Sequence, residues 1–312
     1  MLRASVIIPV YNRPQLVLEA IASALAAPAS RLLEVIVVDD CSTDETWAVL
    51  QTEADPRLRC ERLGANVGRN AARNRGLELA QGDVIKFLDS DDFLDAHHLV
   101  AEIAALEESG ADIAVSGWRE QRGHHAVEFA APTFHLVADD ILAGIAVPTS
   151  AALYVRRPDQ RWDEKIGTLD DWDYFCRCAL EAHKIITVPG IAYTWRHHGG
   201  VRATDCDTLT IAHAHHRILR KIEHRLRETG DLTSPRRRRL AQYFYKELRV
   251  LALNDPVAAE AALEHIFALD PHFTPRDEEP SFIVRSTTRI VGVQNMLRFY
   301  RIAKTMKMRF AS

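Results

Sequence analysis

Ala4-Ser-Val-Ile-Ile-Pro-Val10 is a short apolar run rich in β-branched residues, which is the pattern of a strand buried on both faces. A similar run, Glu34-Val-Ile-Val-Val38, follows an Ala/Leu-rich segment from Leu16 to Ala26 that predicts a helix. A third, Val84-Ile-Lys-Phe-Leu88, follows a helix predicted over residues 66–80. Strands that alternate with helices pair in parallel through right-handed crossovers, so we expect a doubly wound, mostly parallel α/β sheet.

The pattern changes in the second half of the chain. Further strands are predicted at Ile113 to Trp118, Ala151 to Arg156 and Ile185 to Val188, and the chain becomes helical from about residue 205. We therefore expect two parts, an α/β domain over residues 1–205 and a helical C-terminal extension over residues 206–312.

The composition is that of an ordinary globular protein. The 312 residues are 47% hydrophobic and 26% charged, which excludes a wholly disordered or fibrous chain. A net charge of −4 argues against a nucleic-acid partner. Five cysteines without zinc-site spacing indicate reduced thiols, and we see no signal peptide and no apolar run long enough to span a membrane, so we expect a cytoplasmic protein.

The C-terminal segment combines an apolar stripe with positive charge. Residues 281–312 contain seven basic and no acidic side chains, and a last helix is predicted from Ser281 to Arg309. Two interpretations stay open for it. The helix packs its stripe on the α/β domain or on a partner subunit in a homo-oligomer, or it lies on the inner face of an anionic membrane as a peripheral contact.

Polar clusters follow three of the predicted strands, and ligands of such sheets bind at the carboxyl ends of the strands. The clusters are Tyr11-Asn12, Asp39-Asp40 and Asp89-Ser-Asp-Asp92. Asp89 and Asp91 are spaced to meet one Mg²⁺ or Mn²⁺ ion, or they form a solvated acidic turn. Asp39-Asp40 either caps a turn or forms hydrogen bonds to a base or ribose.

Three later segments are also rich in functional side chains. Asn66 to Gly76 is dense in Arg and Asn at a helix start, which favours a phosphate clamp or an exposed basic surface. Leu169-Asp-Asp-Trp-Asp-Tyr174 predicts a helix N-cap or a general base. In Trp195-Arg-His-His-Gly-Gly200, a histidine is a metal ligand, a phosphate contact or a plain loop residue. The chain has neither G-x-G-x-x-G nor a P-loop, so a dehydrogenase or a P-loop enzyme is disfavoured.

Taken in order, these segments resemble the family 2 inverting glycosyltransferases, whose nucleotide-binding fold is called GT-A. The segments that carry the resemblance are Ser5 to Asn12, Val37-Val-Asp-Asp-Cys-Ser-Thr-Asp44, Asn66 to Gly76 and Phe87-Leu-Asp-Ser-Asp-Asp92. Asp170-Asp-Trp-Asp and Arg196-x-His198 match more loosely. The resemblance covers about residues 1–205.

The resemblance implies a set of donor-binding residues. They are Pro9, Val10, Tyr11, Asn12, Asp40, Asn66, Gly68, Arg73, Asp89 and Ser90. Within this set, Asp40 is expected to bind the base, Arg73 the diphosphate, and Asp89 the ribose or the donor sugar.

The resemblance also implies a metal site and a catalytic pair. Asp91 and His198 are expected to hold Mg²⁺ or Mn²⁺ together with the phosphates. Asp171 is expected to be the catalytic base, and Asp170 to orient the acceptor. Asp170 replaces the glutamate that is usual in the family.

The resulting expectation is a metal-dependent, inverting hexosyltransferase. It would move a sugar from a nucleotide-sugar donor, UDP-linked in most of the resembled family, to a hydroxyl of a polysaccharide, lipid-linked or protein acceptor. A sugar nucleotidyltransferase is an alternative, but Tyr11-Asn-Arg-Pro14 is not the Gly-rich loop that it needs after the first strand. A non-catalytic nucleotide-sugar-binding scaffold is another, and the presence of both Asp91 and Asp171 argues against it.

Overall fold

The computed structural model describes residues 1–197 and 206–274, and the chain divides into two compact units, Met1–Val201 and Arg202–Ser312. The predicted metal ligand His198 and the predicted basic helix at the C-terminus lie outside the described residues. Among the helices within the described ranges, none is long and apolar enough to cross a membrane.

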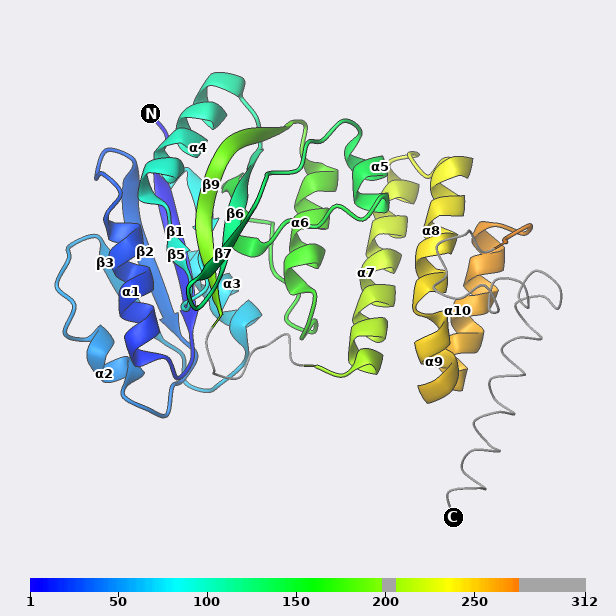
Figure 1. Cartoon of the computed structure of the whole chain (residues 1–312), viewed down its shortest axis with the longest axis horizontal. Coiled ribbons are helices and arrows are strands. Elements are labelled where there is room, and N and C mark those ends of the chain that lie inside the picture. Colours follow the sequence, from blue (N-terminus) through cyan, green and yellow to red (C-terminus); the bar gives the residue numbers. More distant parts are fainter. Residues whose placement is uncertain (198–205, 275–312) are drawn as a thin grey trace, which may run out of the picture. The chain divides into compact units, whose positions relative to one another are not determined.

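The first unit is built on a sheet whose nine described strands have the order β3-β2-β1-β4-β8-β6-β9-β5, with β7 paired to β6 (Figure 1). Their bounds are β1 Ala4–Val10, β2 Leu32–Asp39, β3 Leu58–Arg62, β4 Val84–Phe87, β5 Phe93–Leu94, β6 Ile113–Arg122, β7 His125–Phe129, β8 Ala152–Val155 and β9 Ile185–His197. The neighbours from β3 to β4 are parallel, as are β6 and β9, whereas β8 runs antiparallel to both β4 and β6. The predicted α/β class is confirmed.

The connecting helices are α1 Pro14–Leu25, α2 Thr46–Leu50, α3 Arg69–Leu79, α4 Ala96–Ser109, α5 Val137–Leu142 and α6 Asp170–Glu181, with one turn of 3₁₀ helix at Thr149–Ala151. Pro14 opens α1 at a position where its missing N–H costs no hydrogen bond. Gly68 precedes α3 with φ +97°, a conformation that residues with a Cβ seldom adopt.

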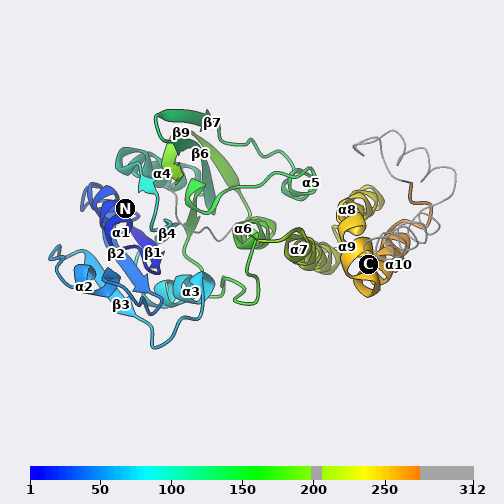
Figure 2. The ribbon, with the colours of Figure 1, turned by 60° about the horizontal axis from the view of Figure 1, so that its bottom comes forward.

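Both faces of β1 are covered by helices, and all seven of its residues are buried. Side chains alternate along a strand, so Val6 and Ile8 point to one face and Ile7 to the other. Val6 and Ile8 share a core with buried residues of α1 and α4. Ile7 faces α3, which lies on the opposite side of the sheet (Figure 2). The sequence of β1 is therefore apolar throughout because neither face meets water.

Helix α3 approaches the sheet closely at Gly76. A Cβ added at this position would overlap the Cγ2 methyl of Ile7. Only glycine allows the helix to lie so near β1. This close approach sets the position of the polar N-terminal turn of α3 at the end of the sheet.

The second half of the sheet differs from the sequence prediction. The strand predicted to end at Val188 continues as β9 to His197, through Pro189-Gly190. Val188 pairs with Ser116 but Ile191 pairs with Gly117, so Pro189 and Gly190 form a bulge and the ladder resumes beyond them. The long β9 carries the chain back beside Phe93 and Leu94 of β5.

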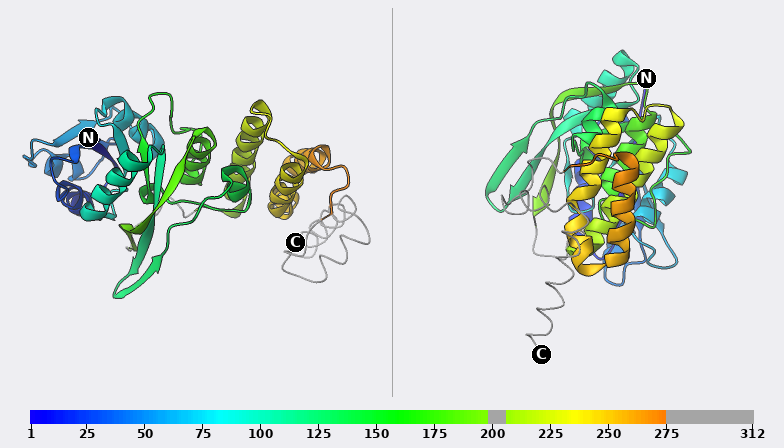
Figure 3. Two further views of the ribbon diagram at one scale, coloured as in Figure 1. Left: turned by 90° about the horizontal axis from the view of Figure 1, so that it is seen from above. Right: turned by 90° about the vertical axis from the view of Figure 1, so that its right-hand side faces the viewer.

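The second unit is helical. Its described helices are α7 Thr208–Glu228, α8 Ser234–Lys246, α9 Leu248–Asn254 and α10 Pro256–Leu269 (Figure 3, right). Ile218, Ile222 and Leu226 are buried on one face of α7, and Ile211 is half-buried. Phe244 of α8 and Ile266 of α10 are also fully buried in this unit.

Candidate active site

Parallel strands bring the predicted polar clusters to one edge of the sheet. β2, β1 and β4 are neighbours, and Tyr11-Asn12, Asp39-Asp40 and Asp89 to Asp92 lie at or directly after their carboxyl ends. Pro9 and Val10 are the last buried residues of β1, and Val10 accepts a hydrogen bond from the backbone N–H of Asp40 (2.9 Å). The structure thus brings together polar residues that lie as far apart in the sequence as Tyr11 and Asp92.

Tyr11 and Asn12 form the first side of this edge. The Tyr11 side chain is 41% exposed, which is unusual for an aromatic residue that follows a buried strand. Asn12 has φ +53°, and its Oδ1 accepts a hydrogen bond from the Thr43 N–H at 2.8 Å. Its own N–H donates to the Ser42 hydroxyl at 2.9 Å. Asn12 therefore joins the loops after β1 and β2 and leaves the Tyr11 ring accessible.

Asp40 organises the loop before α3. Its two carboxylate oxygens accept hydrogen bonds from the N–H groups of Val67 and Gly68, each at 2.8 Å, and its side chain is almost fully buried. A carboxylate has further lone pairs, so these bonds leave room for another donor. Asn66, directly before this pair, is exposed to solvent. The expected contact of Asp40 with a base stays a prediction.

The Asp89–Asp92 loop is held by arginines from three elements. Asp89 is 42% exposed at its side chain and pairs with Arg73 Nη2 at 2.7 Å. Asp91 is less exposed and pairs with Arg13 Nη1 at 2.5 Å. Arg196 of β9 donates from Nε to the Asp91 carbonyl oxygen at 2.5 Å. The two carboxylates of the predicted metal motif are thus neutralised by arginines.

Asp92 and Ser90 are buried, unlike Asp89. Burial, together with the charges of Asp89 and Asp91, raises the pKa of Asp92 well above its usual value. Its Oδ1 accepts the backbone N–H of Arg196 at 3.1 Å. Asp92 therefore fastens β9 to the loop. The sequence prediction assigned it no role, because its partner lies 104 positions away.

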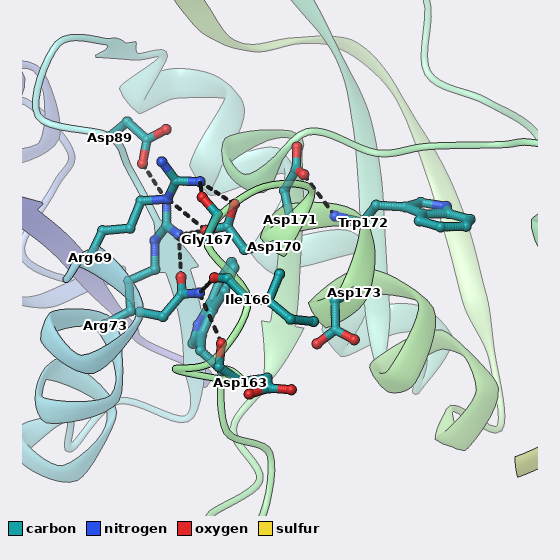
Figure 4. Close-up of polar contacts among 12 residues, drawn as sticks. Arg69, Arg73, Asp89, Asp163, Ile166, Gly167, Asp170, Asp171, Trp172 and Asp173 are labelled. Atoms are coloured by element: carbon teal, nitrogen blue, oxygen red, sulfur yellow. Dashed lines mark hydrogen bonds and ion pairs between the residues drawn. The ribbon is translucent and has the colours of Figure 1, made fainter. Parts of the chain in front are cut away.

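Arg73 is the centre of the site, where it lies between Asp89 and Asp170 (Figure 4). Its side chain is 2% exposed, and its Nη1 donates to Asp170 Oδ2 at 2.8 Å. The guanidinium also stacks over the Trp162 ring, 4.3 Å from the centroid. Arg73 thus links the Asp89 loop to the start of α6. Its predicted approach to a diphosphate remains a prediction.

Asp170 and Asp171 are adjacent but have opposite electrostatic environments. Arg69 donates to both oxygens of Asp170, with Nε at 2.7 Å from Oδ2. Burial alone would raise the pKa of Asp170, but the Arg69 hydrogen bond and the charges of Arg73 and Arg69 lower it overall. Asp170 is therefore an ionised structural partner of two arginines.

Asp171 points away from these arginines, and its Oδ1 accepts the N–H of Trp172 at 2.8 Å (Figure 4). It keeps part of its surface exposed. Burial, and next the negative charge of Asp170, raise the pKa of Asp171 to about 6. A carboxylate with such a pKa is ionised at neutral pH and still basic enough to accept a proton.

Helix α3 also holds the segment that leads to these aspartates. Asn70 Nδ2 donates to the carbonyl oxygens of Asp163 (3.1 Å) and Ile166 (2.9 Å). Asn74 Oδ1 accepts the Trp162 N–H at 2.8 Å, and its Nδ2 donates to the Trp162 carbonyl oxygen at 3.0 Å. The arginines and asparagines repeat at a spacing of four on one face of the helix. The sequence prediction saw this repeat only as a phosphate clamp or a basic surface.

The carboxylates are compatible with a divalent cation. Within residues 1–197 and 206–274, no group of three or more His, Cys, Asp or Glu side chains is arranged to hold a metal by itself. Mg²⁺ is commonly held by one or two carboxylates plus substrate phosphates, and Asp91 with Asp89 supplies that donor set. Arg13 shows that a positive charge is already favourable at Asp91.

Comparison with known proteins finds relatives whose names point to glycan synthesis. Residues 5–149 match the family model described as glycosyl transferase family 2. Succinoglycan biosynthesis protein ExoO of Rhizobium meliloti is 41% identical over 109 residues, 35% of this chain and 31% of ExoO. The poly(ribitol-phosphate) beta-N-acetylglucosaminyltransferase TarS of Staphylococcus aureus is 26% identical over 202 residues, 62% of this chain and 35% of TarS. The chain therefore matches about a third of the length of these curated relatives.

Solved structures resemble the chain in fold. TarS residues 1–349 in complex with UDP-GlcNAc give a TM-score of 0.70 at 20% identity, covering 97% of this chain and 88% of that one. The mannosyltransferase PcManGT from Pyrobaculum calidifontis, in complex with GDP-Man and Mn²⁺, gives 0.50 at 18% identity, covering 98% and 84%. The likeness to TarS confirms the predicted GT-A-type fold.

Proposed function

From the match of residues 5–149 to glycosyl transferase family 2, we propose that the chain transfers a sugar from a UDP-linked donor to an acceptor hydroxyl, with inversion, in glycan synthesis. The observation that carries the proposal is the pair Asp170–Asp171 at the start of α6. Two adjacent carboxylates with pKa values displaced in opposite directions are suited to two roles, one structural and one as a base.

The donor is proposed to bind along the edge formed by β2, β1 and β4. The exposed Tyr11 ring offers a stacking surface for a base, and Asp40 has lone pairs left for a base N–H. UDP-GlcNAc is the ligand in the TarS complex of similar fold, which favours a UDP-sugar. The pyrophosphate would then lie near the Asp89–Asp92 loop. Because both are negatively charged, a cation between them is needed to offset their repulsion.

We assign Asp91 to hold Mg²⁺ or Mn²⁺ together with the donor phosphates, and Asp89 to contact the ribose or the donor sugar. When bound, the cation would neutralise the negative charge that develops on the leaving diphosphate. Arg13, which pairs with Asp91, would have to release this carboxylate, and its guanidinium could then pair with a donor phosphate. Asp89 and Asp170 hold the Arg73 guanidinium between them, so Arg73 connects the Asp89–Asp92 loop to the start of α6.

The chemical step requires a base on the acceptor side. Asp171 would accept the proton of the acceptor hydroxyl as this oxygen bonds to the anomeric carbon and the bond to the diphosphate breaks. The two bonds lie on opposite faces of the carbon, so the configuration inverts and no covalent enzyme intermediate forms. Asp170 keeps Asp171 basic by its negative charge and is itself held by Arg69 and Arg73.

The test is a calorimetric titration with UDP, GDP and dTDP, with and without Mn²⁺, on the wild type, Asp91→Ala and Asp171→Asn. We expect UDP binding that depends on Mn²⁺, is weakened by Asp91→Ala and is retained in Asp171→Asn. Donor turnover, measured as UDP release, should fall at least about a hundredfold in Asp171→Asn. Binding of no nucleotide under either condition would favour a different function for the fold.

A further inference from the structure

The outer part of the sheet, made by β7, β6 and β9, has two unlike faces. Three rows of side chains run across it in register, and alternation places them on one face. The rows are Phe129–Trp118–Tyr193, Val127–Glu120–Trp195 and His125–Arg122–His197. We call this set the aromatic face. The opposite face of β6 and β7 carries Arg119 and Glu128, which form an ion pair at 2.6 Å.

Ring contacts within the aromatic face agree with this register. The rings of Trp118 and Phe129 stack, with centroids 5.2 Å apart and planes 12° from parallel. The rings of Trp195 and His197 lie 5.1 Å apart. His197 Nε2 also contacts Glu120 Oε1. Flat rings are therefore interspersed with groups that form hydrogen bonds.

Much of the aromatic face is accessible. Val127 is 57% and Phe129 37% exposed, and Trp118 and Trp195 are both partly exposed. Every residue of β7 is exposed, and the hairpin of β6 and β7 projects from the body of the sheet (Figure 3, left). Exposed apolar side chains that form a continuous patch commonly mark a binding surface.

Strand β9 links the aromatic face to the Asp89–Asp92 loop of the proposed site. Arg196 alternates with the residues of the aromatic face, and through Arg196 the strand is bound to the Asp91 carbonyl oxygen and the Asp92 carboxylate. The inner end of the face is Tyr193, which is 3% exposed. Burial and the charges of Asp92, Asp89 and Asp171 raise the pKa of Tyr193 well above its usual value. The face therefore begins beside the carboxylates and extends outward to the hairpin.

We infer that the aromatic face binds the saccharide chain of the acceptor. Sugar rings present C–H groups on their flat sides, which pack on aromatic rings, and hydroxyls at their edges, which hydrogen-bond to polar groups such as Glu120, Arg122 and His197. A surface of rings spaced among such groups therefore suits a saccharide better than it suits a purely apolar partner. The inference rests on the proposed function, because β9, which carries the face, is bound to the Asp89–Asp92 loop of the proposed site, and a saccharide held there would be the acceptor.

The test measures binding of chitotetraose, cellotetraose and laminaritetraose to the full chain with UDP and Mn²⁺, by saturation-transfer difference NMR. We expect at least one of them to bind the wild type, and Trp118→Ala to weaken it about tenfold or more while the Kd for UDP changes less than twofold. Trp118→Phe should recover most of the affinity, since it restores a ring. Arg119→Ala, on the opposite face of the same strand, is the matched control and should bind as the wild type does.

Val127→Asp is a second variant that does not remove core volume, because Val127 is largely exposed. It should lower the affinity for the saccharide, as Trp118→Ala does. Unchanged saccharide affinity in both variants, or no binding of any of the three probes to a protein that binds UDP, overturns the inference but leaves the proposed function intact. A dimer in the wild type that Val127→Asp dissociates, measured by light scattering, would assign the face to a second copy instead. Failure to bind UDP would count against the proposed function itself.

Discussion

Replacement of Asp170 by Asn should shift the pH dependence of the reaction to more acidic values. The proposed base Asp171 has a pKa of about 6, raised by burial and then by the charge of Asp170. Such a group is about nine-tenths ionised at pH 7 and about one-tenth at pH 5, so kcat/KM of the wild type should fall about tenfold between these values. Asp170→Asn removes one negative charge and leaves Arg69 and Arg73 less neutralised. Both changes favour the ionised form of Asp171, so its pKa falls. The acid limb of the pH profile, where kcat/KM declines as the pH is lowered, therefore moves to lower pH.

The assay is UDP release between pH 4.5 and 8, at saturating metal and with buffers of constant ionic strength. Asp173→Asn is the matched control, because Asp173 is also buried in the first turn of α6 but pairs with Arg177 at 2.9 Å. It should lose stability without moving the acid limb. The loss of a buried ionic partner costs about 3–5 kcal/mol, so the folded fraction of each variant is measured at every pH. An acid limb at the same pH in the wild type and Asp170→Asn would refute the proposed coupling.

Three further perturbations test other parts of the structure. Asn74→Ala should lower the free energy of unfolding by about 1–3 kcal/mol in urea unfolding, because the buried backbone groups of Trp162 lose their partners. In steady-state kinetics it should lower kcat more than the affinity for UDP. Arg13→Ala should strengthen Mn²⁺ binding to the nucleotide-free protein up to about fivefold, since Asp91 loses a competing cation; weaker binding in calorimetry would contradict this. Gly76→Ala should lower stability by about 1–3 kcal/mol through overlap with β1, whereas Gly64→Ala, which has open space around it, should change the melting temperature little.

The first half of the fold could be predicted because its signals are local. A parallel strand buried on both faces must be apolar at every position, so β1 was predicted with the bounds that the structure has, Ala4–Val10. The same holds for β2, whose predicted core Glu34 to Val38 lies within Leu32–Asp39. Helices between such strands leave little choice of topology.

The second half could not be predicted as well because its strands break local rules. β9 continues past Pro189-Gly190, a pair that ordinarily ends a strand, because the bulge there lets the ladder resume at Ile191. β5 has only two residues, and β7 is exposed along its whole length, so neither has an apolar pattern to recognise. Their pairing depends on partners elsewhere in the sheet.

The candidate site shows the same limit at the level of single side chains. Sequence alone places Arg73 near the start of a helix, where an anion is favoured. Which anion lies there depends on the tertiary structure. Here it is the carboxylate of Asp170, 97 positions along the chain, together with Asp89. A guanidinium that is 2% exposed and engaged on both sides is poorly placed to leave for a phosphate, whereas Arg13 is more exposed and pairs with Asp91 of the metal motif. Arg13, which the sequence did not single out, is therefore the better candidate for the arginine that exchanges a carboxylate for the donor phosphates, and Arg73 for the fixed link that keeps donor and base in register.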